Sequence, residues 1–174
     1  KNQFFKDLNE DDFTPKFGIC HQSTSKSKVN LAKKQNIITF VGKLNSAKGY
    51  DIFGHTIIKI LDKYPNWRSI VVGDEPREKH VFKHKNLKIY SFKENKFVLN
   101  LLKKASISVA CSRWEEPFGR SSLEATANGC AVIISNRGGL PETITNGIIL
   151  KKLTSEQIYL EIEKLINDSK QRNS

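Results

Sequence analysis

The sequence of 174 residues contains no methionine, only three cysteines and no long apolar run. A chain that opens at Lys1 without any Met lacks an initiator, so we expect it to be a piece of a longer protein. The longest uninterrupted apolar stretches, such as residues 131–134, are far shorter than the roughly 18 to 20 residues that a membrane-spanning helix needs. The sequence does not begin with a basic stretch followed by an apolar core and a small-residue cleavage site, so no secretory signal is visible. The length suits one compact domain.

The cysteines Cys20, Cys111 and Cys130 are odd in number, widely separated and without a CxxC pair. This spacing indicates neither a disulfide framework nor a zinc site, so we expect three small core residues and no bound metal. Free thiols suit a reducing compartment. We therefore expect a cytoplasmic location, with peripheral attachment to the inner membrane face as a further possibility.

Acidic residues are also scarce: the sequence contains 18 Asp and Glu and 29 Lys and Arg, which gives a formal net charge of +11. Residues 77–104, which we call the basic interval, hold nine Lys or Arg but only Glu78 and Glu94, and so contribute +7. Such an interval is usually a solvated surface, and it is also typical of proteins that bind nucleic acid or an anionic membrane. It carries no recognised nucleic-acid motif, so nucleic acid is not the expected partner.

Strand-like and helix-like segments alternate after a polar opening that ends at Lys34. We expect residues 1–34 to hold an inter-domain connection and a first strand near 17–20, and residues 35–174 to form the domain. Apolar, β-branched runs predict strands over 37–41, 69–72, 87–90, 107–110, 131–134 and near 148. Helical spacing of apolar residues predicts helices over 50–64, 96–104, 119–127 and 155–167.

Strands that are apolar throughout and alternate with helices predict an α/β fold, a Rossmann-like parallel sheet with helices on both faces. In such sheets ligands bind beyond the carboxyl ends of the strands. The loops after residues 41, 72, 90, 110 and 134 therefore form the candidate site.

The loop after residue 110 carries two acids eight positions apart, Glu116 and Glu124. A carboxylate has acceptor oxygens and no donor, so it suits a vicinal diol such as a sugar or a ribose. Between the acids, Gly119 allows close backbone approach and a helix N-terminus offers amides to phosphate. The alternatives are structural: Ser121 and Glu124 have the spacing of a capping box, and Glu116 could be an exposed loop acid.

Two further loops carry residues that suit a phosphorylated ligand. Lys43 and Lys48 flank the first strand-to-helix turn, where two cations can neutralise a diphosphate. The pair Gly138-Gly139 follows a strand and lets the chain pass close to a ligand or adopt positive φ.

The succession VGKLNSAKG, VVGDE, SRWEEPFGRSSLEATANG and GGLPE resembles the C-terminal, donor-binding domain of the retaining group 1 (family 4) glycosyltransferases of the GT-B fold. The resemblance covers residues 37–170, and the two acids with the intervening Phe-Gly are its specific part. The sequence departs from the family at Lys43, where Arg is usual, at Ser91, where Gly is common, and at residues 21–23, where His-Gln-Ser replaces Asn-Gly-Val.

The resemblance implies roles for the acids and the residues between them. Glu116 would hold hydroxyls of the donor sugar, and Glu124 would hold the ribose. Phe118 and Gly119 would offer backbone amides to the sugar, with Gly119 and Arg120 near the phosphates.

The resemblance also implies roles for the other loops. Lys43 and Lys48 would bind the diphosphate and stabilise the charge of the departing nucleotide. The backbone of residues 90–92, including Ser91, would face the base. No metal or other cofactor is implied, because the nucleotide-diphosphate sugar is a substrate.

The implied function is the donor half of an enzyme that moves a hexose from a UDP- or GDP-sugar to a cell-surface glycan such as lipopolysaccharide core, with retained configuration. The acceptor, a glycan or a lipid-linked glycan, would bind a separate N-terminal domain, so this piece alone would bind donor and transfer nothing. The alternative is a basic domain that binds nucleic acid or an anionic membrane without transferase chemistry.

Overall fold

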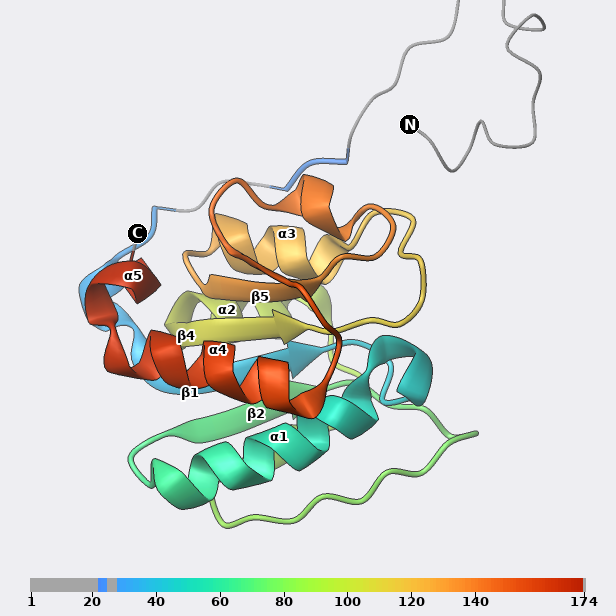
Figure 1. Cartoon of the computed structure of the whole chain (residues 1–174). Helices are drawn as coiled ribbons and strands as arrows, with labels where there is room; N and C mark the ends of the chain where they lie inside the picture. The colour runs from blue at the N-terminus through green and yellow to red at the C-terminus, as the bar shows by residue number, and fades with distance from the viewer. Residues whose placement is uncertain (1–21, 25–27, 174) are drawn as a thin grey trace, which may run out of the picture.

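The computed structural model describes residues 22–24 and 28–173 (Figure 1). These residues form a six-stranded sheet in the order β3-β2-β1-β4-β5-β6, and neighbouring strands are parallel throughout. The strands are β1 (Gln35–Val41), β2 (Arg68–Val72), β3 (Leu87–Tyr90), β4 (Ala105–Ala110), β5 (Ala131–Ser135) and β6 (Ile148–Leu150). The helices are α1 (Tyr50–Lys63), α2 (Asn95–Lys104), α3 (Arg120–Ala127), α4 (Ser155–Asn167) and α5 (Ser169–Asn173).

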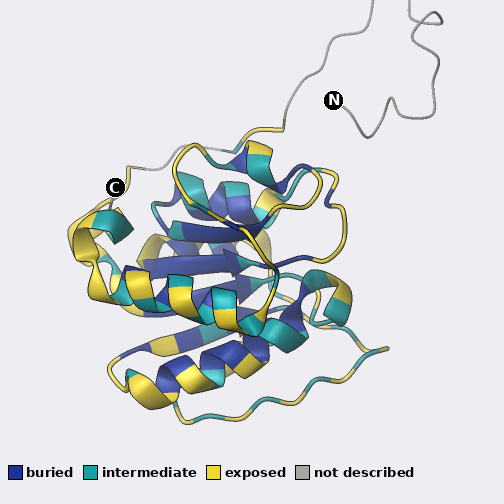
Figure 2. Ribbon diagram, in the orientation of Figure 1, coloured by how far each residue is buried: buried dark blue, intermediate teal, exposed yellow. Residues whose placement is uncertain are grey.

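The central strands are buried on both faces, as Figure 2 shows by their dark colour. Ile38 of β1 belongs to a core cluster shared with α1 and α4, whereas the adjacent Ile37 belongs to a second cluster shared with α2 and α3. Alternate side chains of a strand point to opposite faces. Helices α1 and α4 therefore cover one face of the sheet, and α2 and α3 cover the other (Figure 1).

The prediction of a Rossmann-like parallel sheet with helices on both faces is confirmed. Each strand and helix predicted within residues 35–174 is present, with ends that differ by at most two residues. The structure adds the short helix α5 and three 3-10 turns, η2 (Leu31–Lys33), η3 (Ser46–Lys48) and η4 (Leu140–Thr143). The predicted first strand near 17–20 lies outside the described residues, and the domain boundary at residue 34 remains a prediction.

Two of the cysteines lie in the core, as expected. Cys111 and Cys130 are buried and free, and burial raises the pKa of the Cys111 thiol to about 12. Cys20 lies outside the described residues. Among the helices that the structure describes, none combines the length and the apolar character needed to cross a lipid bilayer.

Lys34 joins the segment before β1 to the ends of two helices. Its ammonium donates to the carbonyl oxygens of Leu102 at 2.9 Å, Ala105 at 2.8 Å and Asn128 at 2.6 Å. Ala105 and Asn128 are the C-caps of α2 and α3, so the charge of the amine lies where both helices present unpaired carbonyls. Burial lowers the pKa of Lys34, and the thiol of Cys130 opposes this shift.

We expect Lys34→Met to lower the free energy of unfolding by about 2 kcal/mol, because three carbonyl oxygens lose a charged donor. Lys33→Met, at an exposed neighbouring position, should change stability by less than about 0.5 kcal/mol. Urea unfolding of both variants measures the difference. Equal stability of the two variants would show that the contacts of Lys34 contribute nothing.

Candidate functional site

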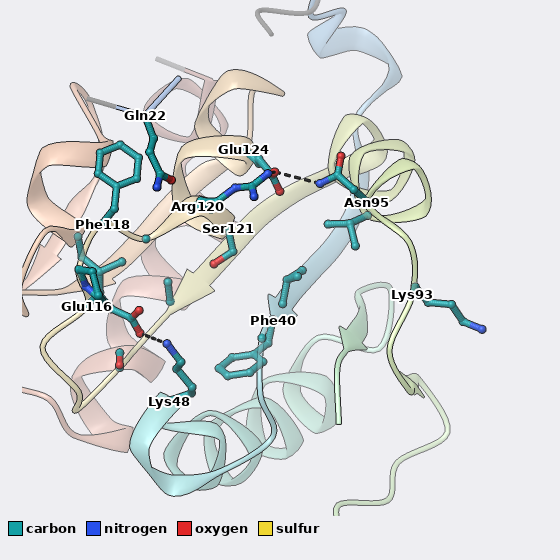
Figure 3. Close-up of a pocket in the computed structure, with 18 of the residues that line it drawn as sticks. Gln22, Phe40, Lys48, Lys93, Asn95, Glu116, Phe118, Arg120, Ser121 and Glu124 are labelled. Atoms are coloured by element: carbon teal, nitrogen blue, oxygen red, sulfur yellow. Dashed lines mark hydrogen bonds and ion pairs between the residues drawn. The ribbon is translucent and has the colours of Figure 1, made fainter. Parts of the chain in front are cut away.

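A pocket of about 570 Å³ lies at the carboxyl ends of the parallel strands. Its wall combines residues after β1 and β4, the loop before α3, and the loop between β3 and α2 (Figure 3). The predicted site residues that line it are Lys48, Glu116, Phe118, Gly119, Arg120 and Glu124. Because parallel strands end at the same edge, loops far apart in the sequence share one pocket, as expected.

Glu116 is buried in the pocket wall, with 9% of its surface exposed, and is not the exposed loop acid of the alternative interpretation. Its carboxylate forms an ion pair with the ammonium of Lys48, which comes from the end of η3 (Figure 3). Its backbone oxygen accepts a hydrogen bond from the amide of Gly139 at 2.7 Å. The Glu116 carboxylate and the Lys48 ammonium therefore meet at one side of the pocket.

Glu124 lies in the second turn of α3, and 8% of its surface is exposed. Its Oε1 accepts hydrogen bonds from Asn95 Nδ2 at 3.0 Å and from Arg120 Nη2 at 3.4 Å. The capping-box alternative is wrong, because α3 begins at Arg120 and its N-cap, Gly119, has no side-chain cap bond. The carboxylate of Glu124 faces the pocket and does not close its own helix.

The start of α3 lies between the two acids. Gly119 has φ of 101°, a left-handed conformation that favours glycine, and a Cβ added there would lie 2.6 Å from Leu140 Cδ2. The first turn of a helix leaves amides without an intrahelical partner. In this chain that turn begins with Arg120 and Ser121, which both line the pocket. The pocket therefore offers donors between two carboxylates.

The loop after β4 is fixed against η3. The amides of Arg113 and Trp114 donate to Ala47 O at 2.8 and 3.1 Å. The Arg113 guanidinium binds both carboxylate oxygens of Asp51, at 2.6 and 2.7 Å, and these hydrogen bonds lower the pKa of Asp51. These contacts hold Ala47, the residue before Lys48, against Arg113 and Trp114, which precede Glu116 by three and two positions.

Two predicted site residues are not part of the pocket wall. Lys43 and Ser91 are exposed, and neither lines the pocket. The wall also includes polar residues to which the sequence assigned no binding role, namely Gln22, Lys93, Asn95, Ser112 and Ser121. Asn95 was missed because it lies within the basic interval. The composition of that interval predicted only a charged surface.

The sequence and fold of this chain match known proteins. The family described as glycosyl transferases group 1 matches residues 21–174. Spore coat protein SA of Bacillus subtilis is 30% identical over 165 residues, which cover 84% of this chain and 43% of that protein. The lipopolysaccharide core biosynthesis mannosyltransferase LpsB of Rhizobium meliloti is 26% identical over 145 residues, 78% of this chain and 40% of that protein.

Solved structures show the same fold. The C-terminal domain of the glycosyl transferase group 1 protein LpcC from Francisella tularensis is 30% identical, with a TM-score of 0.70, and covers 79% of this chain and 78% of that one. Anabaena HepE in complex with UDP-glucose has a TM-score of 0.68 at 20% identity, covering 80% of this chain and 41% of that one.

The fold is therefore that of the C-terminal half of a GT-B glycosyltransferase, and the predicted resemblance is confirmed. The chain belongs to the group 1 glycosyltransferase family. It spans less than half of the length of the curated relatives that it matches.

We expect Gly138→Ala to lower the free energy of unfolding by about 2–4 kcal/mol and to displace the Glu116 loop. Gly138 has φ of 53°, and a Cβ there would lie 2.2 Å from Glu116 O. Amide hydrogen exchange at Gly139, whose amide bonds Glu116 O, should become faster.

Gly129→Ala is the matched control for that substitution. Gly129 has a similar φ of 71°, but a Cβ there would meet the side chain of Val29, and not backbone. It should destabilise the chain by about 1 kcal/mol and leave exchange at Gly139 unchanged after correction for stability. The same exchange rate in both variants would contradict a specific effect on the Glu116 loop.

Proposed function

We propose that this chain is the donor-binding half of a retaining glycosyltransferase and that its pocket binds a nucleotide-diphosphate sugar. The observation that supports this most strongly is the order of groups along the wall. Glu124 lies at one side, the first turn of α3 follows, and Glu116 with Lys48 lies at the other side (Figure 3). A nucleotide sugar has the matching order of diol, diphosphate and sugar hydroxyls.

In this arrangement Glu124 accepts hydrogen bonds from the ribose hydroxyls. The diphosphate lies against the start of α3, near Gly119 and Arg120, where free amides and the helix dipole favour an anion. Glu116 accepts hydrogen bonds from the sugar, together with backbone amides at Phe118 and Gly119. Each carboxylate acts only as an acceptor, which suits hydroxyl groups.

The lysines supply positive charge to the leaving group. When the bond between the anomeric carbon and the β-phosphate oxygen breaks, its electron pair stays on the phosphate. A cation placed there lowers the energy of the developing charge. Lys48 lies in the pocket wall and is the principal candidate, and the exposed Lys43 would have to turn inward to assist it.

The base is the least defined part of the donor. We assign it to the loop after β3, where Phe92 lines the pocket and Ser91 lies beside it. The Anabaena structure with UDP-glucose supports a UDP-sugar. A GDP-sugar carries the same ribose, diphosphate and sugar hydroxyls and remains the alternative donor. The matching Rhizobium mannosyltransferase supports a cell-surface glycan, such as lipopolysaccharide core, as acceptor. Because that acceptor would bind the other half, this chain alone should bind donor without transferring sugar.

We expect Glu124→Ala to weaken binding of UDP by about tenfold to a hundredfold, because it removes a charged acceptor for the ribose. Glu116→Ala should weaken UDP-glucose by a similar factor but leave UDP unchanged or bound more tightly, because Lys48 loses its carboxylate partner. Calorimetric titrations of both ligands, and of GDP and its sugars, test this difference.

Glu156→Ala provides the control, since Glu156 is an exposed acid on α4. It should bind each ligand as the unaltered chain does. Equal and negligible effects of Glu116→Ala and Glu124→Ala on both ligands would reject the proposed function.

The basic interval favours a second role, docking of the domain on an anionic membrane. Lys83, Lys85 and Lys88 are exposed on edge strand β3 and the loop before it. Val81 and Ile89, exposed by 75% and 40%, belong to the same stretch of the chain. Exposed apolar side chains between lysines suit a lipid surface better than the hydrophilic backbone of a nucleic acid. This placement would bring the donor pocket to a membrane-bound acceptor.

We expect Lys83→Ala/Lys85→Ala/Lys88→Ala to weaken binding to phosphatidylglycerol vesicles by about a hundredfold, since each lysine contributes about 1 kcal/mol near an anionic surface. UDP binding should not change. The control triple variant, at the exposed Lys151, Lys152 and Lys170, should bind vesicles normally. Binding to single-stranded RNA but not to vesicles would overturn membrane docking.

A further inference from the structure

Asn95 connects the basic interval to the pocket. It is the first residue of α2, it lines the pocket, and its amide nitrogen reaches Glu124 of α3 (Figure 3). The distance from Asn95 Nδ2 to Glu124 Oε1 is 3.0 Å. The two residues are 29 positions apart, so the contact depends on how α2 and α3 pack on the same face of the sheet.

The hydrogen bond has a fixed direction, because a carboxylate can only accept and the Asn amide supplies the N–H. In the described part of the chain, both hydrogen bonds to the Glu124 carboxylate end on Oε1, and no residue donates to Oε2. The second donor, Arg120, is weaker. Its Nη2 lies 3.4 Å from Oε1, and 71% of its side chain is exposed. Asn95 therefore holds one oxygen, and the other has no hydrogen-bond donor among residues 22–24 and 28–173.

We propose that Asn95 is a positioning residue: it fixes Oε1 of Glu124 so that Oε2 accepts the hydroxyls of a nucleotide ribose. The inference rests on the proposed function, because it presupposes that Glu124 binds ribose. A glutamate side chain loses rotamer freedom when it binds a ligand. Holding it beforehand removes part of that loss, so Asn95 raises affinity without touching the ligand.

The test compares UDP with 2′,3′-dideoxy-UDP by calorimetry, or the GDP pair where GDP binds more tightly. Asn95→Ala should weaken UDP by about fivefold to tenfold and leave the dideoxy analogue unchanged. In a Glu124→Ala background, Asn95→Ala should have no further effect on UDP. This coupling is the signature of a residue that acts through Glu124.

Asn95→Asp separates positioning from a merely structural role. An acid in the first turn favours the helix, whereas a second carboxylate beside Glu124 opposes folding, so the melting temperature is measured alongside binding. The new carboxylate would face Glu124 and repel it, so UDP should bind more weakly than to Asn95→Ala. A merely structural role predicts that Asn95→Asp binds UDP more tightly than Asn95→Ala, because Asp has nearly the shape of Asn.

Asn100→Ala is the matched control, since Asn100 is an exposed asparagine on the same helix and lies outside the pocket wall. It should bind both ligands normally. Equal weakening of UDP and dideoxy-UDP by Asn95→Ala, or effects that add to those of Glu124→Ala, would overturn the inference alone. If Glu124→Ala keeps the same ratio of affinities for UDP and dideoxy-UDP as the unaltered chain, Glu124 does not bind the ribose. That result would reject the proposed role of Glu124, and the inference with it.

Discussion

The site depends on the close passage of one backbone segment over another. The turn after β5 crosses the loop before α3 so tightly that a Cβ on Gly138 would lie 2.2 Å from Glu116 O and 2.6 Å from Glu116 N. The amide of Gly139 donates to the same Glu116 oxygen at 2.7 Å. Residue 138 must therefore be glycine for two reasons: a side chain would collide with the Glu116 backbone, and the positive φ favours glycine. This contact fixes the backbone of the acid that pairs with Lys48.

The ion pair between Lys48 and Glu116 has a consequence for binding. Both groups are proposed to contact the donor, but without donor they neutralise one another. A bare carboxylate in a largely buried wall would cost free energy, and the ammonium removes that cost. A diphosphate that recruits Lys48 would leave Glu116 uncompensated unless sugar hydroxyls take the place of the ammonium. If the pocket binds the proposed donor, the pair would favour a ligand that carries both a diphosphate and a sugar over a nucleotide alone.

The sequence predicted the fold well because each element carries its own local signal. Apolar strands such as β1 and amphipathic helices such as α1 follow from periodicity, and the shared edge of parallel strands brings Glu116, Glu124 and Lys48 together. Contacts between distant segments were not predictable. Asn95 belongs to a lysine-rich stretch, and its approach to Glu124 follows only from the packing of α2 beside α3. Lys43 matched a motif position, yet its side chain is exposed, since a motif does not specify where a flexible side chain points.

Helix α2 is held at both of its ends, and this links the site to the segment before the sheet. At its C-terminus the Lys34 ammonium binds Leu102 O and the C-cap carbonyl of Ala105. At its N-terminus Asn95 binds Glu124. A helix of this length spans about 15 Å. The Lys34 contacts therefore lie at the amino ends of the strands and the Asn95 contact at their carboxyl ends, so the same helix that presents Asn95 to Glu124 is anchored on the side of the sheet away from the pocket.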